Sequence, residues 1–326
     1  MITRRTIVLA LGAGALTAPL ASFAQQQPVK IPRIGILTEY PSPMLDGFIQ
    51  GLRELGYIEG KNILLERRFT ANDPEKARAY AQELVALRVD VIFARASAAV
   101  EPARRATSQI PIVFSTHNDP VGVGHAVSIA RPGGNITGLT QMAGELNIKN
   151  LELIKELLPR ATRVAVLSDP TVPSHVPALK GIALAGKKLA LTIHFLEASS
   201  VEQVDLAFQA AAKAGDRGLL LLTSPLSLSK YEPMAVLALK YRLPVMFGGV
   251  RAAVDVGGLI SYGPDLIELN RRAATYVDRI LKGEKPASMA IEQPTKFELA
   301  INMKTAKTLG IKVPNSILVQ ATKVIE

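Results

Sequence analysis

Hydroxyl and charged side chains follow most of the short apolar runs of this sequence, at the points where strands would end. Arg95 and Ser97 come after one such run, and Thr116, His117 and Asp119 come after the next. In open parallel sheets, ligands bind beyond the carboxyl ends of the strands, where loops and helix N-termini offer backbone N–H groups. We therefore predict a ligand-binding site at these residues, completed by Tyr40, Asp169, Thr223, Ser224 and Tyr262.

Arg95 is the residue of this set with the most specific chemistry. Its guanidinium could hold an anion through two parallel hydrogen bonds, and we expect the replacement of Arg95 by Ala to weaken binding at least tenfold, about 1.4 kcal/mol. The alternative is a surface arginine or an ion pair with Glu101. Ser97 would be an N-cap whose neighbours' free N–H groups hold a carboxylate. Simple helix capping is the alternative for Ser97, Asp119 and Asp169.

Two further residues keep open alternatives. His117 either contacts the ligand or lies at the surface, and Tyr40 either stacks on a ring of the ligand or lines the hinge. The chain has only four His, and none forms an HExxH or metal-spaced pair. It has no Cys, no GxSxG elbow and no phosphate-binding loop. These absences predict a binding protein without a cofactor, a metal or enzymatic activity.

The segments around the site residues predict strands and helices in alternation. Strands are expected over 33–37, 63–69, 89–93 and 110–114. Helices are expected over 74–87 and 97–107, and a first helix places Leu45, Phe48, Ile49, Leu52 and Leu55 on one face before Gly56. This order is typical of a parallel sheet with helices on both faces.

The same order begins again in the second half of the chain. Residues 163–167 resemble residues 33–37 after about 130 residues, which is too long a period for a solenoid repeat. Residues 243–247 likewise copy residues 110–114, with Pro111 and Pro244 at equivalent places. The fold class is therefore predicted as α/β with two similar lobes, each a parallel sheet flanked by helices. The alternative is a coincidence among generic parallel strands.

Three turn-rich segments are expected to carry the chain between the lobes. They are residues 131–138, residues 257–263 and the stretch from Pro286 to Pro294. The predicted N-terminal lobe is 31–138 plus 263–288, and the predicted C-terminal lobe is 139–262 plus 289–326. The helix in the first lobe's second piece would bury Leu266, Leu269, Ala273, Tyr276 and Ile280. Three crossings make a three-segment hinge, which lets two lobes close on a ligand.

The N-terminus has the pattern of an export signal over residues 1–24. Arg4 and Arg5 precede an apolar run over 7–16 and a small-residue stop at Ala24. The paired arginines leave Sec and twin-arginine export both open. We therefore expect a soluble periplasmic protein. The net charge of +10 is dispersed and aromatic residues are few, which argues against nucleic-acid binding.

Several longer motifs carry a resemblance to a known family. They are Gly51-Leu52-Arg53-Glu54-Leu55-Gly56-Tyr57, Ile110-Pro111-Ile112-Val113-Phe114, Arg131-Pro132-Gly133-Gly134-Asn135, Ser261-Tyr262-Gly263, Ile280-Leu281-Lys282-Gly283-Glu284 and Gln293-Pro294-Thr295-Lys296-Phe297-Glu298-Leu299. With these motifs the chain resembles the ABC transporter substrate-binding proteins of the tryptophan/tyrosine type, which have the type I periplasmic binding protein fold.

The resemblance implies a function and roles for individual residues. It implies a monomeric periplasmic receptor that delivers a small solute to an ABC transporter permease in the inner membrane. Ser97 would match a hydroxyl near the ligand's carboxylate, and Asp119 would match an acid that meets an amino group. Arg95 and His117 depart from the family pattern. They favour a ligand with extra negative charge, such as an aromatic or dicarboxylic acid, over a plain amino acid.

Two other classes of protein remain as alternatives. A ligand-sensing receptor domain shares this architecture, but a repressor of that kind needs an N-terminal DNA-binding segment where this chain has an export signal. A two-domain α/β enzyme, such as a glycosyltransferase, would need crowded carboxylates or a metal in the cleft.

Overall fold

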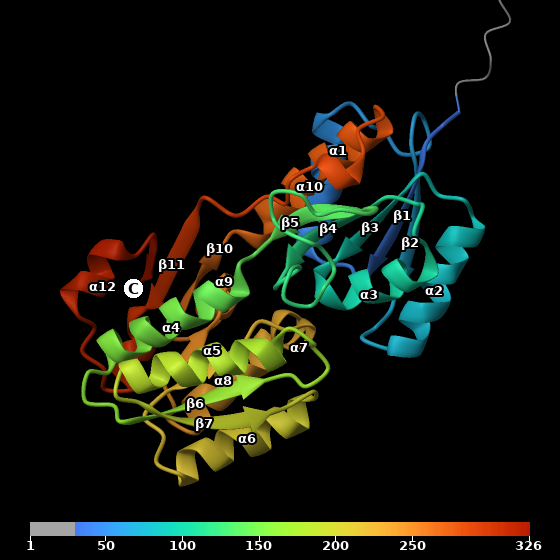
Figure 1. Cartoon of the computed structure of the whole chain (residues 1–326). Coiled ribbons are helices and arrows are strands. Elements are labelled where there is room, and N and C mark those ends of the chain that lie inside the picture. Colours follow the sequence, from blue (N-terminus) through green and yellow to red (C-terminus); the bar gives the residue numbers. More distant parts are fainter. Residues whose placement is uncertain (1–29) are drawn as a thin grey trace, which may run out of the picture. The chain divides into compact units, whose positions relative to one another are not determined.

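The strands of this protein form two separate sheets, one from each half of the sequence (Figure 1). The computed structural model describes residues 30–326, and residues 32–326 group into one unit. The predicted export signal over residues 1–24 lies outside the described residues and stays a prediction. Within residues 30–326, no helix is long and apolar enough to cross a membrane.

The first sheet has five parallel strands in the order β2-β1-β3-β4-β5. Its strands are β1 (Arg33–Thr38), β2 (Leu64–Phe69), β3 (Val91–Arg95), β4 (Ile112–His117) and β5 (Ile136–Thr140). The three central strands are buried along almost their whole length. Continuous apolar runs of this kind are expected of parallel strands that helices cover on both faces.

Helices cover both faces of the first sheet (Figure 1). One face carries α1 (Pro43–Glu54) and α10 (Leu266–Leu281), with the 3₁₀ helix η1 (Pro286–Ser288) beside β5. The other face carries α2 (Pro74–Ala86) and α3 (Ala96–Ala106). The predicted apolar face of α10 is confirmed, since all five of its expected residues are buried. Helix α3 continues through Pro102, which lies inside it.

Helices α1 and α10 approach each other closely because α1 carries two glycines one turn apart. A Cβ on Gly47 would lie 2.8 Å from the carbonyl oxygen of Ile267, and one on Gly51 would collide with the carbonyl of Arg271. On its other side, α1 packs the Phe48 ring flat against Phe93 of β3, with the ring centroids 3.8 Å apart. These contacts fix α10, which is distant in sequence, to the first sheet.

The second sheet repeats this plan and extends it. Its order is β12-β11-β10-β9-β8-β6-β7. The strands are β6 (Arg163–Ser168), β7 (Thr192–Glu197), β8 (Leu219–Leu221), β9 (Val245–Phe247), β10 (Ile260–Pro264), β11 (Phe297–Asn302) and β12 (Lys323–Ile325). Every pairing is parallel except that of β10 with β11, which is antiparallel. The prediction of parallel sheets therefore holds for all pairings but this one.

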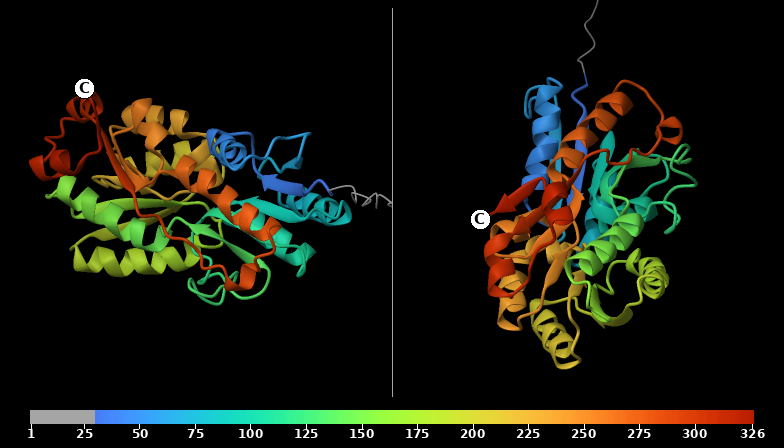
Figure 2. Two further views of the ribbon diagram at one scale, coloured as in Figure 1. Left: turned by 90° about the horizontal axis from the view of Figure 1, so that it is seen from above. Right: turned by 90° about the vertical axis from the view of Figure 1, so that its left-hand side faces the viewer.

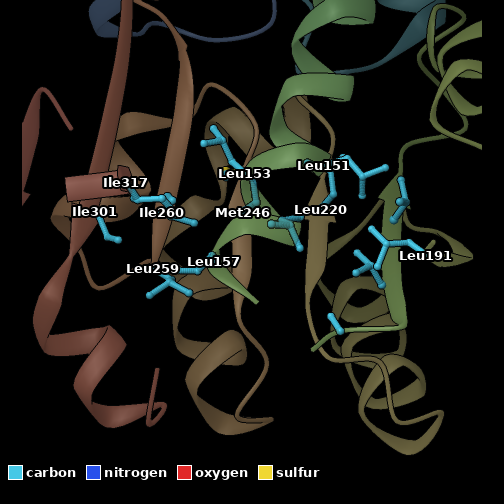
Figure 3. Close-up of a cluster of buried hydrophobic side chains, with 14 of the residues drawn as sticks. Leu151, Leu153, Leu157, Leu191, Leu220, Met246, Leu259, Ile260, Ile301 and Ile317 are labelled. Atoms are coloured by element: carbon cyan, nitrogen blue, oxygen red, sulfur yellow. The ribbon is translucent and has the colours of Figure 1, made fainter. Parts of the chain in front are cut away.

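Two helical layers enclose the second sheet, as Figure 2 shows from two directions. Helices α4 (Ala143–Leu157), α5 (His175–Lys188), α11 (Met303–Thr308) and α12 (Asn315–Gln320) contribute to one core, part of which is drawn in Figure 3. Helices α6 (Val201–Lys213), α8 (Tyr231–Lys240) and α9 (Arg251–Asp255) contribute to the other. The short helix α7 (Pro225–Ser229) adds Leu226 and Leu228 to its edge.

The prediction of two similar lobes is confirmed by the strand orders. Reading from β2 to β5 in the first sheet and from β7 to β10 in the second gives equivalent strands in the same positions. One detail was wrong, because Pro111 and Pro244 precede strands β4 and β9 rather than lying inside them. Each proline carbonyl accepts an N–H from the neighbouring strand at 2.8 Å, from Ile92 and from Leu219. The exact limits of the two lobes stay a prediction.

Candidate functional site

Loops from both sheets meet at the carboxyl ends of the strands. Asn118, after β4, donates its Nδ2 hydrogen to Ser174 Oγ at 2.9 Å, and its Oδ1 accepts from Gln141. Around this contact lies a narrow space, which we call the central cleft. It is lined by Ala96, Ser97, Ala98, Thr116, Asn118, Gln141, Val172, Thr223, Ser224, Pro225 and Leu228. The sheet geometry thus brings four predicted site residues together: Ser97, Thr116, Thr223 and Ser224.

A larger cavity of about 710 Å³, the outer pocket, adjoins the central cleft and shares Pro225 and Leu228 with it. Its walls include aromatic and apolar side chains together with several charged ones. They include Tyr40, Pro41, Met44, Arg95, Lys230, Tyr231, Val250, Arg251, Ile267 and Glu298. A cavity of this size and composition is of the kind that encloses small organic ligands.

The N-terminus of α3 opens into the central cleft without a side-chain cap. The prediction that Ser97 is the N-cap is wrong, because the helix begins one residue before it and Arg95 occupies the N-cap position without a capping hydrogen bond. Ala96, Ser97 and Ala98 of the first turn line the cleft. The first N–H groups of a helix have no partner within the helix and carry a partial positive charge. This helix end is therefore suited to an anionic group.

Thr116 adds a second feature beside that helix end. Its hydroxyl is buried and has no hydrogen-bond partner among the described residues, although it lines the central cleft. Its backbone has a φ of 55°, a conformation that β-branched residues rarely adopt. Unsatisfied buried polar atoms and strained backbone both concentrate at functional sites. The Thr116 hydroxyl is free to bind a ligand.

Arg95 has a partner inside the first lobe. Its Nη2 is bonded to Glu39 Oε2, and its Nε donates to Thr38 Oγ1 at 2.8 Å. Both charged side chains are only 4% exposed. The alternative partner, Glu101, is instead bonded to Arg104, Arg105 and His125. Arg95 borders the outer pocket, but most of its positive charge is balanced by Glu39.

Glu39 was not among the predicted site residues, although it lies in the loop directly after β1. Its Oε2 accepts from Arg95 and, at 3.2 Å, from the Thr38 hydroxyl. Its Oε1 is buried and has no partner among the described residues. An acidic residue directly after a buried parallel strand was the available sequence signal, but nothing in the local pattern separated it from an ordinary loop residue.

His117 is fully buried, so the surface position is wrong. It does not line the central cleft or the outer pocket, and its contact with a ligand stays a prediction. Its Nδ1 accepts the Asp119 N–H at 3.1 Å, which places the ring proton on Nε2. Nε2 then donates to His125 Nδ1 at 2.8 Å, and His125 Nε2 donates to Glu101 at 3.0 Å. Burial lowers the pKa of both histidines, that of His117 well below its ordinary value. Both rings are neutral near pH 7.

Ser97 connects this histidine chain to the cleft. Its Oγ accepts the Asn118 N–H at 3.0 Å and lies 3.3 Å from His117 Nδ1. Because the Asp119 N–H already satisfies that nitrogen, the Ser97 hydroxyl can turn its hydrogen toward a ligand without leaving the imidazole unpaired. The Ser97 hydroxyl therefore remains available to a ligand, and the buried His117 ring lies next to it.

The remaining predicted residues lie outside the central cleft. Tyr40 lines the outer pocket. Asp119 borders a third cavity of about 570 Å³ and accepts the Gly122 N–H at 2.7 Å. Asp169 accepts from the backbone and hydroxyl of Thr171, as expected of a turn residue. Tyr262 stacks on Phe297, with the ring centroids 5.8 Å apart, and packs against the core of the second sheet.

Within residues 30–326, no group of three or more His, Asp or Glu side chains is placed to hold a metal ion. The polar groups of the central cleft are hydroxyls, amides and backbone N–H groups. Such an arrangement can bind and orient a ligand.

Comparisons with known proteins agree with this geometry. A family model described as ABC transporter substrate binding protein matches residues 39–325. The chain is 27% identical over 284 residues to the tyrosine-binding protein of Clostridioides difficile (strain R20291), covering 86% of this chain and 81% of that protein.

Two solved structures are similar over nearly the whole described chain. A conserved domain protein from Vibrio cholerae has a TM-score of 0.84 and 29% identity, over 90% of this chain and 100% of that one. An ABC domain from Streptococcus pneumonia, solved in complex with L-Trp, has a TM-score of 0.82 and 25% identity, over 90% and 99%. The predicted type I periplasmic binding protein fold is confirmed.

Proposed function

Because this chain belongs to the family of ABC transporter substrate-binding proteins, which capture solutes for a permease, we propose that its own solute is an amino-acid-like carboxylate. The proposed binding site is the central cleft together with the outer pocket. We further propose that the protein works outside the cytoplasm after export, as a monomer, and passes its solute to an inner-membrane permease.

The main support for this proposal is two groups of hydrogen-bond donors at the strand ends of the first sheet that have no side-chain partner within the described part of the chain. The uncapped N-terminus of α3 and the free hydroxyl of Thr116 both border the central cleft. A carboxylate placed there would accept hydrogen bonds from backbone N–H groups, from Thr116 and from Ser97. Charge-assisted hydrogen bonds of this kind are stronger than those between neutral groups.

The outer pocket supports an aromatic side chain on the solute. Tyr40, Met44, Leu228 and Tyr231 give it an apolar and aromatic wall directly beside the polar cleft. Two similar proteins are described as binding tyrosine or as being in complex with L-Trp. An aromatic ring in the outer pocket and a carboxylate in the central cleft would use both spaces at once.

The expectation of a ligand with extra negative charge loses its support. It rested on Arg95 and His117, but Arg95 is paired with Glu39 and His117 is buried and neutral. Neither side chain offers an uncompensated positive charge to a second carboxylate. We therefore favour an aromatic amino acid over a dicarboxylic acid.

Binding would draw together the lobes proposed above, 31–138 plus 263–288 and 139–262 plus 289–326. Loops from both sheets line the cleft, so a solute held there would contact both lobes and stabilise the closed arrangement by those contacts. We also propose that the protein has no catalytic activity. Ser97 faces an imidazole nitrogen that already accepts the Asp119 N–H, which leaves it poorly placed to act as a base for a nucleophile.

A thermal-shift screen of the chain from Gln25 onward tests this proposal. The probes are L-tryptophan, L-tyrosine, L-phenylalanine, succinate and benzoate. At a ligand concentration of about 100 times Kd, binding adds about 2.7 kcal/mol of stability. We expect an aromatic amino acid to raise Tm progressively, with the logarithm of the ligand excess, and succinate to leave it unchanged. A shift with succinate alone would contradict the proposed ligand class.

A further inference from the structure

Among the described residues, Glu39 carries the one carboxylate oxygen at the strand ends of the first sheet that is both buried and without a partner. We infer that Glu39 accepts hydrogen bonds from a cationic nitrogen of the solute, the α-ammonium of an amino acid. This inference rests on the proposed function and adds to it a residue and a chemical requirement. The solute must carry a positive charge next to its carboxylate.

The contacts of Glu39 show which oxygen is available. Oε2 is bonded to Arg95 Nη2 and accepts the Thr38 hydroxyl at 3.2 Å, while Oε1 has no partner among the described residues. Glu39 as a whole is 3% exposed, so bulk water reaches it poorly. A buried acceptor left unsatisfied destabilises the protein, and more so when the group is charged. A donor supplied by the solute would remove that destabilisation.

The strand order places Glu39 one strand away from the proposed carboxylate position. Strands β1 and β3 are neighbours in the sheet, with Leu37 opposite Ala94. Glu39 therefore follows the strand next to the one that leads into α3. Neighbouring strands are about 4.8 Å apart. An α-amino acid has its ammonium and carboxylate on one carbon, so it can place the carboxylate at the end of α3 and the ammonium one strand away.

The residues around Glu39 belong to the walls of the site. Tyr40, the next residue in the chain, lines the outer pocket, and so do Arg95 and Met44, whose sulfur lies 3.6 Å from Arg95 Nη1. Arg95 and Glu39 cancel each other's charge, so a zwitterionic solute enters a neutral environment. An acid without an ammonium would bring an uncompensated negative charge next to Glu39.

Experiment can separate this role of Glu39 from two alternatives. Glu39 could serve only as the structural partner of Arg95, in which case its loss would weaken all ligands equally. Asp119, the acid that the family resemblance favours, could hold the ammonium instead. Its Oδ1 is occupied by the Gly122 N–H, and its side chain borders a different cavity.

The test compares two probes that differ by one amino group, L-tryptophan and 3-indolepropionate, by isothermal titration calorimetry. For the unaltered protein we expect L-tryptophan to bind at least about 30-fold more tightly than 3-indolepropionate. For Glu39→Gln, which keeps the shape of the side chain and an acceptor for Arg95, we expect about tenfold or greater loss for L-tryptophan and less than about threefold loss for 3-indolepropionate. Glu66→Gln, which removes a carboxylate near Arg33 and Arg68 in the same sheet, is the matched control and should match the unaltered protein.

Each other outcome decides against the inference. If Glu39→Gln loses affinity equally for both probes, or for neither, Glu39 has only a structural role. Amine-selective loss in Asp119→Asn but not in Glu39→Gln transfers the role to Asp119. Should Glu39→Gln not fold, the unaltered protein still decides, because a preference for L-tryptophan below about threefold overturns the inference without any variant.

The same measurements distinguish failure of the inference from failure of the proposed function. If acids without an amino group bind and none of the twenty amino acids does, the carboxylate site stands and the inference fails. If neither amino acids nor simple acids bind, the proposed function fails and the inference fails with it.

Discussion

The strand ends of the two sheets carry polar side chains of similar kinds but use them differently. In the first sheet, Glu39 Oε1 and Thr116 Oγ1 are buried with no partner among the described residues. In the second sheet, three polar side chains at the strand ends are occupied locally. Asp169 accepts from Thr171, Thr223 is bonded to the Gly248 carbonyl, and Ser224 forms a capping box with Ser227.

This difference indicates that the two halves, although similar in architecture, have different roles in binding and in stability. Unpartnered polar groups in the first sheet are available to a solute, whereas polar groups in the second sheet hold their own loops and helix ends in shape. The third unpartnered buried atom of residues 30–326, Asn150 Oδ1, lies on α4 and not at a strand end. Substitutions of the unpartnered groups in the first sheet should therefore change binding, and substitutions of the occupied polar groups in the second should mainly change stability.

The largest expected effect comes from Arg95→Ala. It leaves the Glu39 carboxylate buried without its partner, and breaking a buried ion pair in this way costs about 3–5 kcal/mol. We therefore expect a loss of that size in the free energy of unfolding, measured by urea denaturation. This effect would appear in the ligand-free protein, in addition to the weaker binding predicted from the sequence.

Arg67→Ala is the matched control for Arg95. Arg67 also pairs with a glutamate, Glu59, through two hydrogen bonds of 2.5 and 2.7 Å, but both side chains are partly exposed. Exposed pairs contribute about 0–1 kcal/mol. Equal stability losses in the two variants would show that burial of the Arg95–Glu39 pair has no special importance.

The contrast between Arg95 and Glu39 shows how far the sequence reaches. Apolar periodicity predicted the alternating elements, the repeated lobe and the buried face of α10, because each depends on local spacing. The partner of Arg95 lies 56 residues earlier in the chain and meets it only because β1 and β3 are neighbours in the sheet. Local patterns contain no information on such pairs unless the strand order is applied to them.

His117 is a second case in which residue type and sequence position do not give the surroundings of a side chain. His117 lies at the end of a strand, a position that suits a ligand contact. Its ring is instead hydrogen-bonded to His125 in the interior. Thr116, its neighbour, is the residue that faces the cleft. Which of two adjacent side chains points into the cleft depends on the backbone conformation at that turn, and the sequence does not specify it.

Acid should destabilise the folded protein as pH falls below about 6.5. Burial lowers the pKa of His117, His125 and His175 in the folded chain, so the unfolded chain binds more protons below the ordinary histidine pKa. Stability is then complete above that pH and is lost below it, by about 1.4 kcal/mol for each unit of pKa difference. Urea denaturation from pH 7.5 to pH 5 measures this slope.

Two variants compare the lobes in the same experiment. His125→Gln keeps a hydrogen-bond donor and acceptor but removes one of the two hydrogen-bonded imidazoles, His117 and His125, in the first lobe. His175→Gln likewise removes the buried imidazole of the second lobe. We expect a flatter pH profile in both. Glu101 does not interfere, because bonds from Arg104 and other donors lower its pKa to about 2. Unchanged slopes in both variants would contradict the role of the buried rings.

Thr116→Val tests the first sheet's free hydroxyl. Valine is also β-branched, so the backbone strain at φ 55° is retained and only the hydroxyl is lost. We expect the affinity for an aromatic amino acid to fall about tenfold, or about 1.4 kcal/mol, because a hydrogen bond to the carboxylate is lost. Stability of the ligand-free protein should not decrease, since the hydroxyl has no partner to lose among the described residues. Isothermal titration calorimetry and urea denaturation separate the two quantities.

Ser224→Ala gives the smallest expected effect and completes the comparison. Ser224 also lines the central cleft, but its hydroxyl accepts the Ser227 N–H at 3.2 Å and caps α7. Loss of an N-cap costs about 1 kcal/mol of stability, so the urea midpoint should fall while affinity changes less than in Thr116→Val. The opposite result, with affinity lost and stability kept, would place a ligand contact in the second lobe. The proposal that only the first sheet supplies polar groups to the solute would then be wrong. The comparison is direct, because Thr116 and Ser224 line the same cleft.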